Sequence, residues 1–280
     1  QKKQKMLAYE MLDEVKTLLG VFFLDDNSTT KNISKISALD MKGMLDNTDF
    51  TDGRIYDGVT AGSDIHEIME AAGISDYEMD DETRETVLYG TLKIQTCRKA
   101  LREVLFACGS TVSTSRMQKM YIHKSDRMIG SKVARDRKFS TTMKMDHYVS
   151  DINVKYTTWT LAAESKQITK GNYKAGIHTI KLSNPAADME ASVGTILKQM
   201  PYYLILQLNA DAEVEITGRK WEGEELSVLS SIEHIRSGEV RSTKTFTGTL
   251  LDYTRAQAVA DSILDYYQLQ QILDIRYVGG

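Results

Sequence analysis

The two cysteines are the residues best placed by type and spacing for nucleophilic chemistry. Cys97 follows Thr96, a predicted helix cap, and precedes the basic residues Arg98 and Lys99. A helix N-terminus and neighbouring cations both stabilise a thiolate, so Cys97 is predicted to be the more reactive thiol. Cys108 falls on the apolar stripe of the same predicted helix and is expected to be an inert core residue.

Both cysteines are nevertheless predicted to be reduced and not catalytic. In one helix, Cys97 and Cys108 would lie about 16 Å apart, which is beyond the ~7 Å that a disulfide spans between Cα atoms. A papain-like site needs a partner histidine, and nothing singles out one of the five in the chain. Residues 62–64, Gly-Ser-Asp, lack the second glycine of a hydrolase elbow. We therefore assign no catalytic residue.

The metal-binding patterns in the sequence are incomplete. Residues 66–70, His-Glu-Ile-Met-Glu, resemble part of a metalloprotease motif, but Glu70 stands where a second histidine would be needed. Residues 25–27, Asp-Asp-Asn, offer oxygen ligands for calcium, yet a β-turn explains them equally well. Another acidic stretch has the same interpretation: Asp40, Asp46, Asp49 and Asp52. We predict no metal site and no cofactor, and a thermal stability that a chelator leaves nearly unchanged.

Composition argues against a nucleic-acid partner and against a membrane-spanning segment. The formal net charge is −4, whereas nucleic-acid binders usually carry a basic excess or a basic face. No run of ~18 apolar residues is present, so no membrane-spanning helix is predicted. The basic stretch at residues 132–138 is expected to be a solvated linker, with contact to an acidic partner as the alternative. The tyrosine pairs at 202–203 and 266–267 could bind sugar, but core packing of one member of each explains them.

The first half of the chain predicts a hairpin and two short helices. The first twenty residues fit either a helix ending at Gly20 or an extended strand, and a turn is predicted at residues 25–28 before a strand at 32–39. A helix is predicted over residues 65–72, capped by Asp64 and stopped by Gly73. Another is predicted from Cys97 to Cys108, followed by a strand or hairpin arm to residue 123.

The second half is dominated by strand patterns. Alternation predicts a strand around residues 148–156, a hairpin from 202 to 218, and a second hairpin from 226 to 246. A helix capped by Thr254 follows, with a closing strand at residues 272–278.

These elements predict an α+β fold in two domains. The charged, aperiodic stretch at residues 124–146 is the predicted boundary. The predicted ranges are a connecting segment at 1–19, an α+β domain at 20–145, and a β-rich domain with a C-terminal helix at 146–280.

Three stretches resemble a known class of proteins. Residues 20–25 with 36–40 and Leu45 resemble the strand–turn–strand opening of tail-tip or baseplate-hub proteins from phages and prophages of Gram-positive bacteria. Residues 96–109, continuing into 112–116, resemble the helix and following strand of those proteins. Residues 256–278 are similar to their closing helix and strand. The resemblance is spread over about residues 15–280.

The resemblance implies a structural, non-enzymatic role. It implies two related β-barrel-like domains with short amphipathic helices, arranged as a homotrimer that joins the tail tube to the spike or receptor-binding proteins. Such a protein would be assembled in the host cytoplasm and would reside in the virion tail. The abrupt start and the Gly279-Gly280 end are also what a piece of a longer protein would show.

Two other classes stay open from the sequence. One is a carbohydrate-binding or hydrolytic tail-fibre module acting on the host surface, although no convergent pair of carboxylates is recognisable. The other is a cytoplasmic α+β protein of unrelated role.

Overall fold

The computed structural model describes residues 4–30, 33–114, 118–125, 138–145, 148–235, 237–268 and 271–277. Over these residues the chain is mostly β-sheet with a few helices, in agreement with the predicted α+β class. The strand pairings of the described residues form open sheets, so the expectation of two barrels is not confirmed.

An N-terminal antiparallel sheet has the order β1-β2-β3, with β1 at Lys5–Leu12, β2 at Val15–Thr30 and β3 at Ile33–Asp40. Asp13 and Glu14 make the β1–β2 turn, both with positive φ, as a tight two-residue turn requires. The helical alternative for the first twenty residues is therefore wrong. The turn predicted at residues 25–28 is also wrong, because β2 continues through it with a bulge between Leu24 and Asp26.

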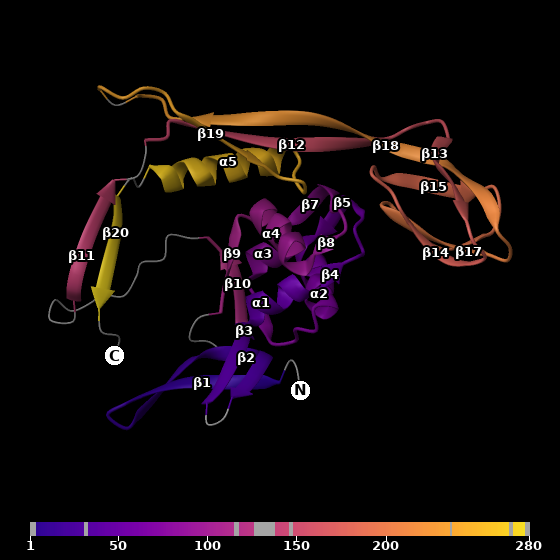
Figure 1. Cartoon of the computed structure of the whole chain (residues 1–280). Helices are drawn as coiled ribbons and strands as arrows, with labels where there is room; N and C mark the ends of the chain where they lie inside the picture. The colour runs from indigo at the N-terminus through magenta and orange to yellow at the C-terminus, as the bar shows by residue number, and fades with distance from the viewer. Residues whose placement is uncertain are drawn as a thin grey trace.

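A helical body follows the sheet (Figure 1). It contains three small sheets with the orders β4-β8, β5-β7 and β6-β10-β9, and helices between them. In chain order its elements are α1 (Met41–Met44), η1 (Leu45–Asn47), β4 (Asp49–Phe50), β5 (Ile55–Thr60), α2 (Ala61–Ala71), β6 (Tyr77–Met79), α3 (Asp81–Glu85), β7 (Val87–Thr91), β8 (Gln95–Thr96), α4 (Cys97–Cys108), β9 (Ser110–Ser113) and β10 (Met120–Lys124).

Helix α4 has the ends that the sequence predicts. The side chain of Thr96 accepts a hydrogen bond from the backbone N–H of Lys99, and Gly109 closes the helix with a φ of 64°. Helix α2 differs from the prediction, because it begins at Ala61 and its cap is Thr60. Asp64 is therefore not a cap but lies inside the helix, where it is fully buried.

The second half forms two further sheets. One has the order β13-β18-β12-β19, with β15 also paired to β18, and the other has the order β14-β17-β16. The strands are β12 (Asp151–Leu161), β13 (Lys166–Tyr173), β14 (Gly176–Lys181), β15 (Ala186–Ala191), β16 (Thr195–Met200), β17 (Tyr203–Leu208), β18 (Ala212–Ser231) and β19 (Thr243–Thr247).

Neither hairpin predicted in this half is found among the strands that the structure describes. The strand β17 pairs with β14 and β16 instead of β18. The strand β19 runs parallel to β12, which lies between β19 and β18. The single strand β18 is 20 residues long and continues through Gly218, where the first hairpin was expected to close.

Helix α5 (Tyr253–Tyr267) lies between the β12–β18 sheet and the helical body, as Figure 1 shows. Its apolar face is buried as predicted, with Ala256, Val259, Ala260 and Leu264 in the core. Its cap is Asp252 instead of Thr254, since the Asp252 side chain accepts from the backbone N–H of Arg255. The closing strand β20 (Gln271–Tyr277) pairs antiparallel with β11 (Lys138–Met145).

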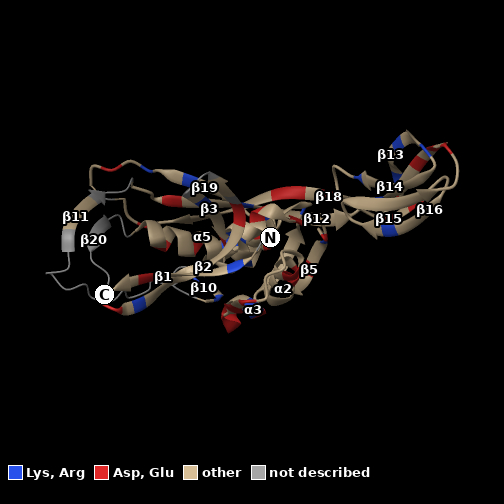
Figure 2. Cartoon of the chain, turned by 60° about the horizontal axis from the view of Figure 1, so that its bottom comes forward, with Lys and Arg blue, Asp and Glu red and all other residues tan. Residues whose placement is uncertain are grey.

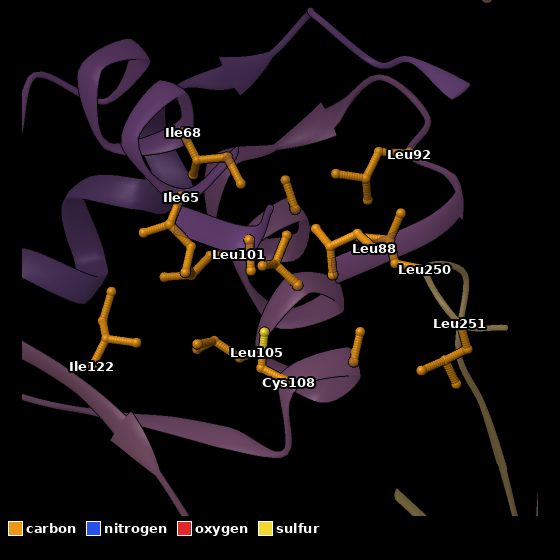
Figure 3. Close-up of a cluster of buried hydrophobic side chains, with 14 of the residues drawn as sticks. Ile65, Ile68, Leu88, Leu92, Leu101, Leu105, Cys108, Ile122, Leu250 and Leu251 are labelled. Carbon is orange, nitrogen blue, oxygen red and sulfur yellow. The ribbon is translucent and has the colours of Figure 1, made fainter. Parts of the chain in front are cut away.

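Two hydrophobic cores hold the fold together. The larger one joins the helical body to α5 and the β12–β18 sheet, and it takes residues from both sides of residue 146. Figure 3 shows Leu250 and Leu251, from the segment before α5, with residues of α2, β7 and α4 in this cluster. A boundary at residue 146 would divide this core. The smaller core lies within residues 168–216, between the sheets of β14–β17 and β13–β18.

Candidate functional site

A cleft with a volume of about 1120 Å³ lies beside helix α2. Ser63, His66 and Glu70 line it from one face of the helix, as their spacing of three and four residues requires. The Nδ1 atom of His66 lies 2.8 Å from the hydroxyl oxygen of Tyr77 on the opposite wall. Among the hydrogen bonds of the described residues, none joins Ser63 to His66.

A buried polar network lies behind α2. The Oδ1 atom of Asp64 accepts a hydrogen bond of 2.6 Å from the Tyr56 hydroxyl, and Oδ2 is buried with no hydrogen-bond partner. Arg54 lies 3.9 Å from Asp64 and forms an ion pair with Glu67 on the surface side. Burial raises the pKa of Asp64 above its usual range, although the Tyr56 hydrogen bond and the Arg54 charge oppose that shift. The network joins β5 to α2 inside the core and is therefore structural.

The structure contradicts the reactive role expected for Cys97. Cys97 and Cys108 are both buried and free. Burial, and then the negative charge of Asp49, raises the pKa of Cys97. Burial also raises the pKa of Cys108 to about 11, so the inert core role expected of that residue is confirmed. The helix N-terminus at Cys97 faces the chain at Thr48, whose carbonyl accepts from the Cys97 backbone N–H at 2.8 Å.

We therefore expect both thiols to resist modification in the native protein. At pH 8 a thiol with a pKa of about 11 holds about 200-fold less thiolate than an ordinary cysteine, and reagent access is closed as well. Titration with a chromogenic disulfide reagent should give almost no fast phase in buffer and two equivalents in guanidinium chloride. One rapidly titrating thiol in buffer would contradict the burial of Cys97.

The other residues singled out in the sequence do not converge. Asp25 and Asp26 lie within strand β2 and not in a calcium-binding loop. Within the described ranges, no group of three or more His, Cys, Asp and Glu side chains is placed to hold a metal ion. Most of the basic stretch at 132–138 lies outside the described residues, which resume with Lys138 in β11.

The tyrosine pairs differ from each other. Tyr202 and Tyr203 are both buried, so the expectation of one exposed member is wrong there. Tyr266 is exposed while Tyr267 packs against the core, as expected.

Exposed apolar side chains gather on an N-terminal arm, which we define as the end of the β1–β2 hairpin at residues 7–19. Figure 1 shows it projecting away from the helical body. Near its tip, Met11, Leu12 and Val15 have exposed fractions of 64%, 57% and 63%. Leu12 and Val15 are directly opposite each other in the ladder, so they form a cross-strand apolar pair in solvent. Sequence analysis missed this surface because it left the helical and extended interpretations of these residues open.

The similarity of this chain to known proteins lies at the level of structure. No protein-family model matches the sequence, and no curated protein matches it. Among solved structures, the chain is similar to one described as the tail protein from Neisseria meningitidis MC58, with 10% sequence identity and a TM-score of 0.49. The match covers 92% of this chain and 64% of that chain, so this chain spans less than two thirds of that protein. In the part of the chain that the structure describes, no helix is both long and apolar enough to cross a membrane.

Proposed function

We propose that the chain is a structural component of a phage or prophage tail tip or baseplate hub, joining the tail tube to the spike or receptor-binding apparatus. The sequence resemblance supports this role, and its segments fall on β2, β3, α4, β9, α5 and β20, which include strands of the N-terminal sheet and helices of the larger core. The proposal is non-enzymatic and places the protein in the virion tail as a homotrimer.

The N-terminal arm is the observation that carries the proposal. A monomeric soluble protein rarely keeps a projecting hairpin with large apolar side chains in water, because each exposed aliphatic side chain loses ~1.5–3 kcal/mol of burial free energy. The arm ends in an acidic turn at Asp13 and Glu14, which keeps the tip soluble before assembly. In a closed ring each copy presents one surface to the next copy and a different surface to the previous one. The arm is suited to be one of those two surfaces, with a second copy of the chain as its partner.

Replacement of Leu12 and Val15 by aspartate should abolish self-association. Two buried charges at an interface cost several kcal/mol, which corresponds to a weakening of the association constant of about 1000-fold or more. Sedimentation equilibrium at increasing concentration would measure it, with the unmodified chain expected to approach three copies. The control is Val240→Asp, which changes a more exposed residue, at 80%, in the loop before β19.

The outcomes separate the alternatives. Loss of the trimer only in the arm variant supports the proposal. A monomeric unmodified chain at every concentration, or a trimer that survives the arm substitutions, would overturn the assignment of the arm as the ring interface.

A further inference from the structure

Three hollows along the sheet that contains β12 and β18 adjoin one another, because neighbouring hollows share lining residues. A central hollow of about 430 Å³ shares Thr157 and Trp159 with a hollow of about 210 Å³ on the helical-body side. It shares Asn184 and Lys220 with a hollow of about 230 Å³ on the opposite side. We call the three together the tryptophan groove. A row of connected hollows suits a linear ligand better than a compact one.

Both tryptophans of the chain line the centre of this groove. Trp159 is opposite Gly223 in the β12–β18 ladder, and Trp221 is opposite Leu161, so the two indoles are diagonal neighbours on one face of the sheet. A Cβ at residue 223 would lie 3.1 and 3.2 Å from two carbons of the Trp159 six-membered ring. The Trp159 ring therefore lies across Gly223, where any larger residue would displace it.

The two indoles are partly exposed to solvent. Both have an intermediate exposure on a sheet whose other face packs on α5. The Nε1 atom of Trp159 is buried and has no hydrogen-bond partner. An unpaired buried N–H costs free energy, so the polar contacts of a ligand in the groove would have to come from the other lining groups.

Polar groups of both charges surround the indoles. Glu222 and Glu225 line the central hollow with Lys220 and Asn184, and Figure 2 shows the acidic stretch on β18. Glu225 also accepts a hydrogen bond of 2.7 Å from Lys155. Carboxylates accept, an ammonium donates, and an amide does both. This mixture of acceptors and donors, with neither charge in excess, is suited to a neutral ligand with many hydroxyls.

We propose that the tryptophan groove binds a neutral linear oligosaccharide. Sugar rings carry apolar C–H faces that pack flat on indole, and hydroxyl edges that bond to carboxylate, amide and ammonium groups. The groove spans the junction between the two cores, where β18 passes from one to the other. The proposal does not depend on the assembly role, because the N-terminal arm lies on a different part of the molecule.

Tryptophan fluorescence offers a site-specific test, since the only two tryptophans are in the groove. The full chain would be titrated separately with cellohexaose, maltohexaose and chitohexaose. We expect a saturable spectral change with at least one of them. Trp221→Ala should weaken binding by about tenfold or more, as truncation of a central aromatic contact does, with Trp159 left as the reporter. Trp221→Phe should recover part of the affinity.

The control is Tyr253→Ala, which removes an exposed aromatic side chain from α5 and should leave affinity unchanged. Circular dichroism and sedimentation would establish that each variant keeps its fold and its oligomeric state, so that failure of binding is distinguished from failure of assembly. Absence of saturation with all three sugars up to ~10 mM, weaker than almost any specific site, would overturn the proposal. Unchanged affinity in folded Trp221→Ala, or saturable binding of a hexathreonine peptide without any sugar binding, would overturn it as well.

Discussion

Replacement of Gly90 by alanine is expected to destabilise the protein by about 4 kcal/mol, in the range that only severe steric or core defects reach. Gly90 has a φ of +119°, which disfavours any side chain. A Cβ at this position would lie 2.1 Å from the carbonyl oxygen of Thr249, an atom that accepts a hydrogen bond from Thr91 at 3.0 Å. The segment before α5 would have to move away from β7, which would open the larger core at Leu250.

Gly58→Ala provides the matched control. Gly58 also has a positive φ, of +83°, and lies in β5 beside β7, but a Cβ there would meet nothing within 4 Å. Its cost should be about 1–2 kcal/mol, that of a left-handed backbone alone. Urea unfolding of both variants would give the difference. Equal losses of stability in the two variants would mean that the steric clash between a Cβ at residue 90 and Thr249 costs nothing.

Removal of the Tyr56 hydroxyl is expected to cost about 3 kcal/mol at pH 7, because it leaves a buried carboxylate without its hydrogen bond. In Tyr56→Phe, both oxygens of Asp64 would lack a hydrogen-bond donor, and the Arg54 guanidinium at 3.9 Å would be the nearest cation. The double variant Tyr56→Phe, Asp64→Asn should recover part of this loss, since no buried charge then remains. A double variant no more stable than Tyr56→Phe would show that the charge of Asp64 is not the cause.

The same residue gives a pH dependence of known sign. Because the folded pKa of Asp64 is raised above its unfolded value of about 3.9, the folded state takes up a proton first as the pH falls. Protonation of Asp64 therefore raises the free energy of unfolding as the pH falls from above its folded pKa to its unfolded pKa. Asp64→Asn should be at least as stable as the unmodified chain at pH 7, and this difference should shrink at acidic pH.

The Asp64 effect has to be measured as a difference in stability between variants, because other carboxyl groups have pKa values shifted in the opposite direction. Burial alone would raise the pKa of Asp80 and Asp151, but hydrogen bonds and nearby lysine or arginine outweigh it and lower both. Urea unfolding between pH 4 and 7 would measure the Asp64 effect after subtraction of the common background. A difference that grows toward acidic pH would contradict the raised pKa.

Local signals in the sequence predicted local structure well. Thr96 and Gly109 bound α4 because a cap bond and a left-handed residue depend on a few adjacent positions. The predicted cap at Asp64 failed because a buried partner, Tyr56, took its side chain into the core instead. A capping motif cannot reveal such a partner, since Tyr56 and Asp64 come into contact only when β5 packs against α2 in the folded protein.

Strand pairing was predicted less well than the strands themselves. Residues 203–208 and 212–217 lie in strands, as alternation indicated, but these strands are not partners. Proximity in sequence favoured a hairpin, whereas burial of the smaller core places β17 between β14 and β16. The same limit applies to the candidate sites. Trp159 and Trp221 are more than 60 positions apart, and only the β12–β18 ladder makes them neighbours.

The continuous strand β18 has a mechanical consequence. Its first part pairs with β13 and β15 beside the smaller core. Its last part, from Trp221 to Ser231, pairs with β12. A pull on the distal sheet along the strand would load the β12–β18 hydrogen bonds together in shear, so that they must break as a group and not one after another. The β13–β15 part of the sheet is thus connected to the larger core by a continuous strand and not by a flexible linker. Force applied to that part would be transmitted along β18 into the larger core.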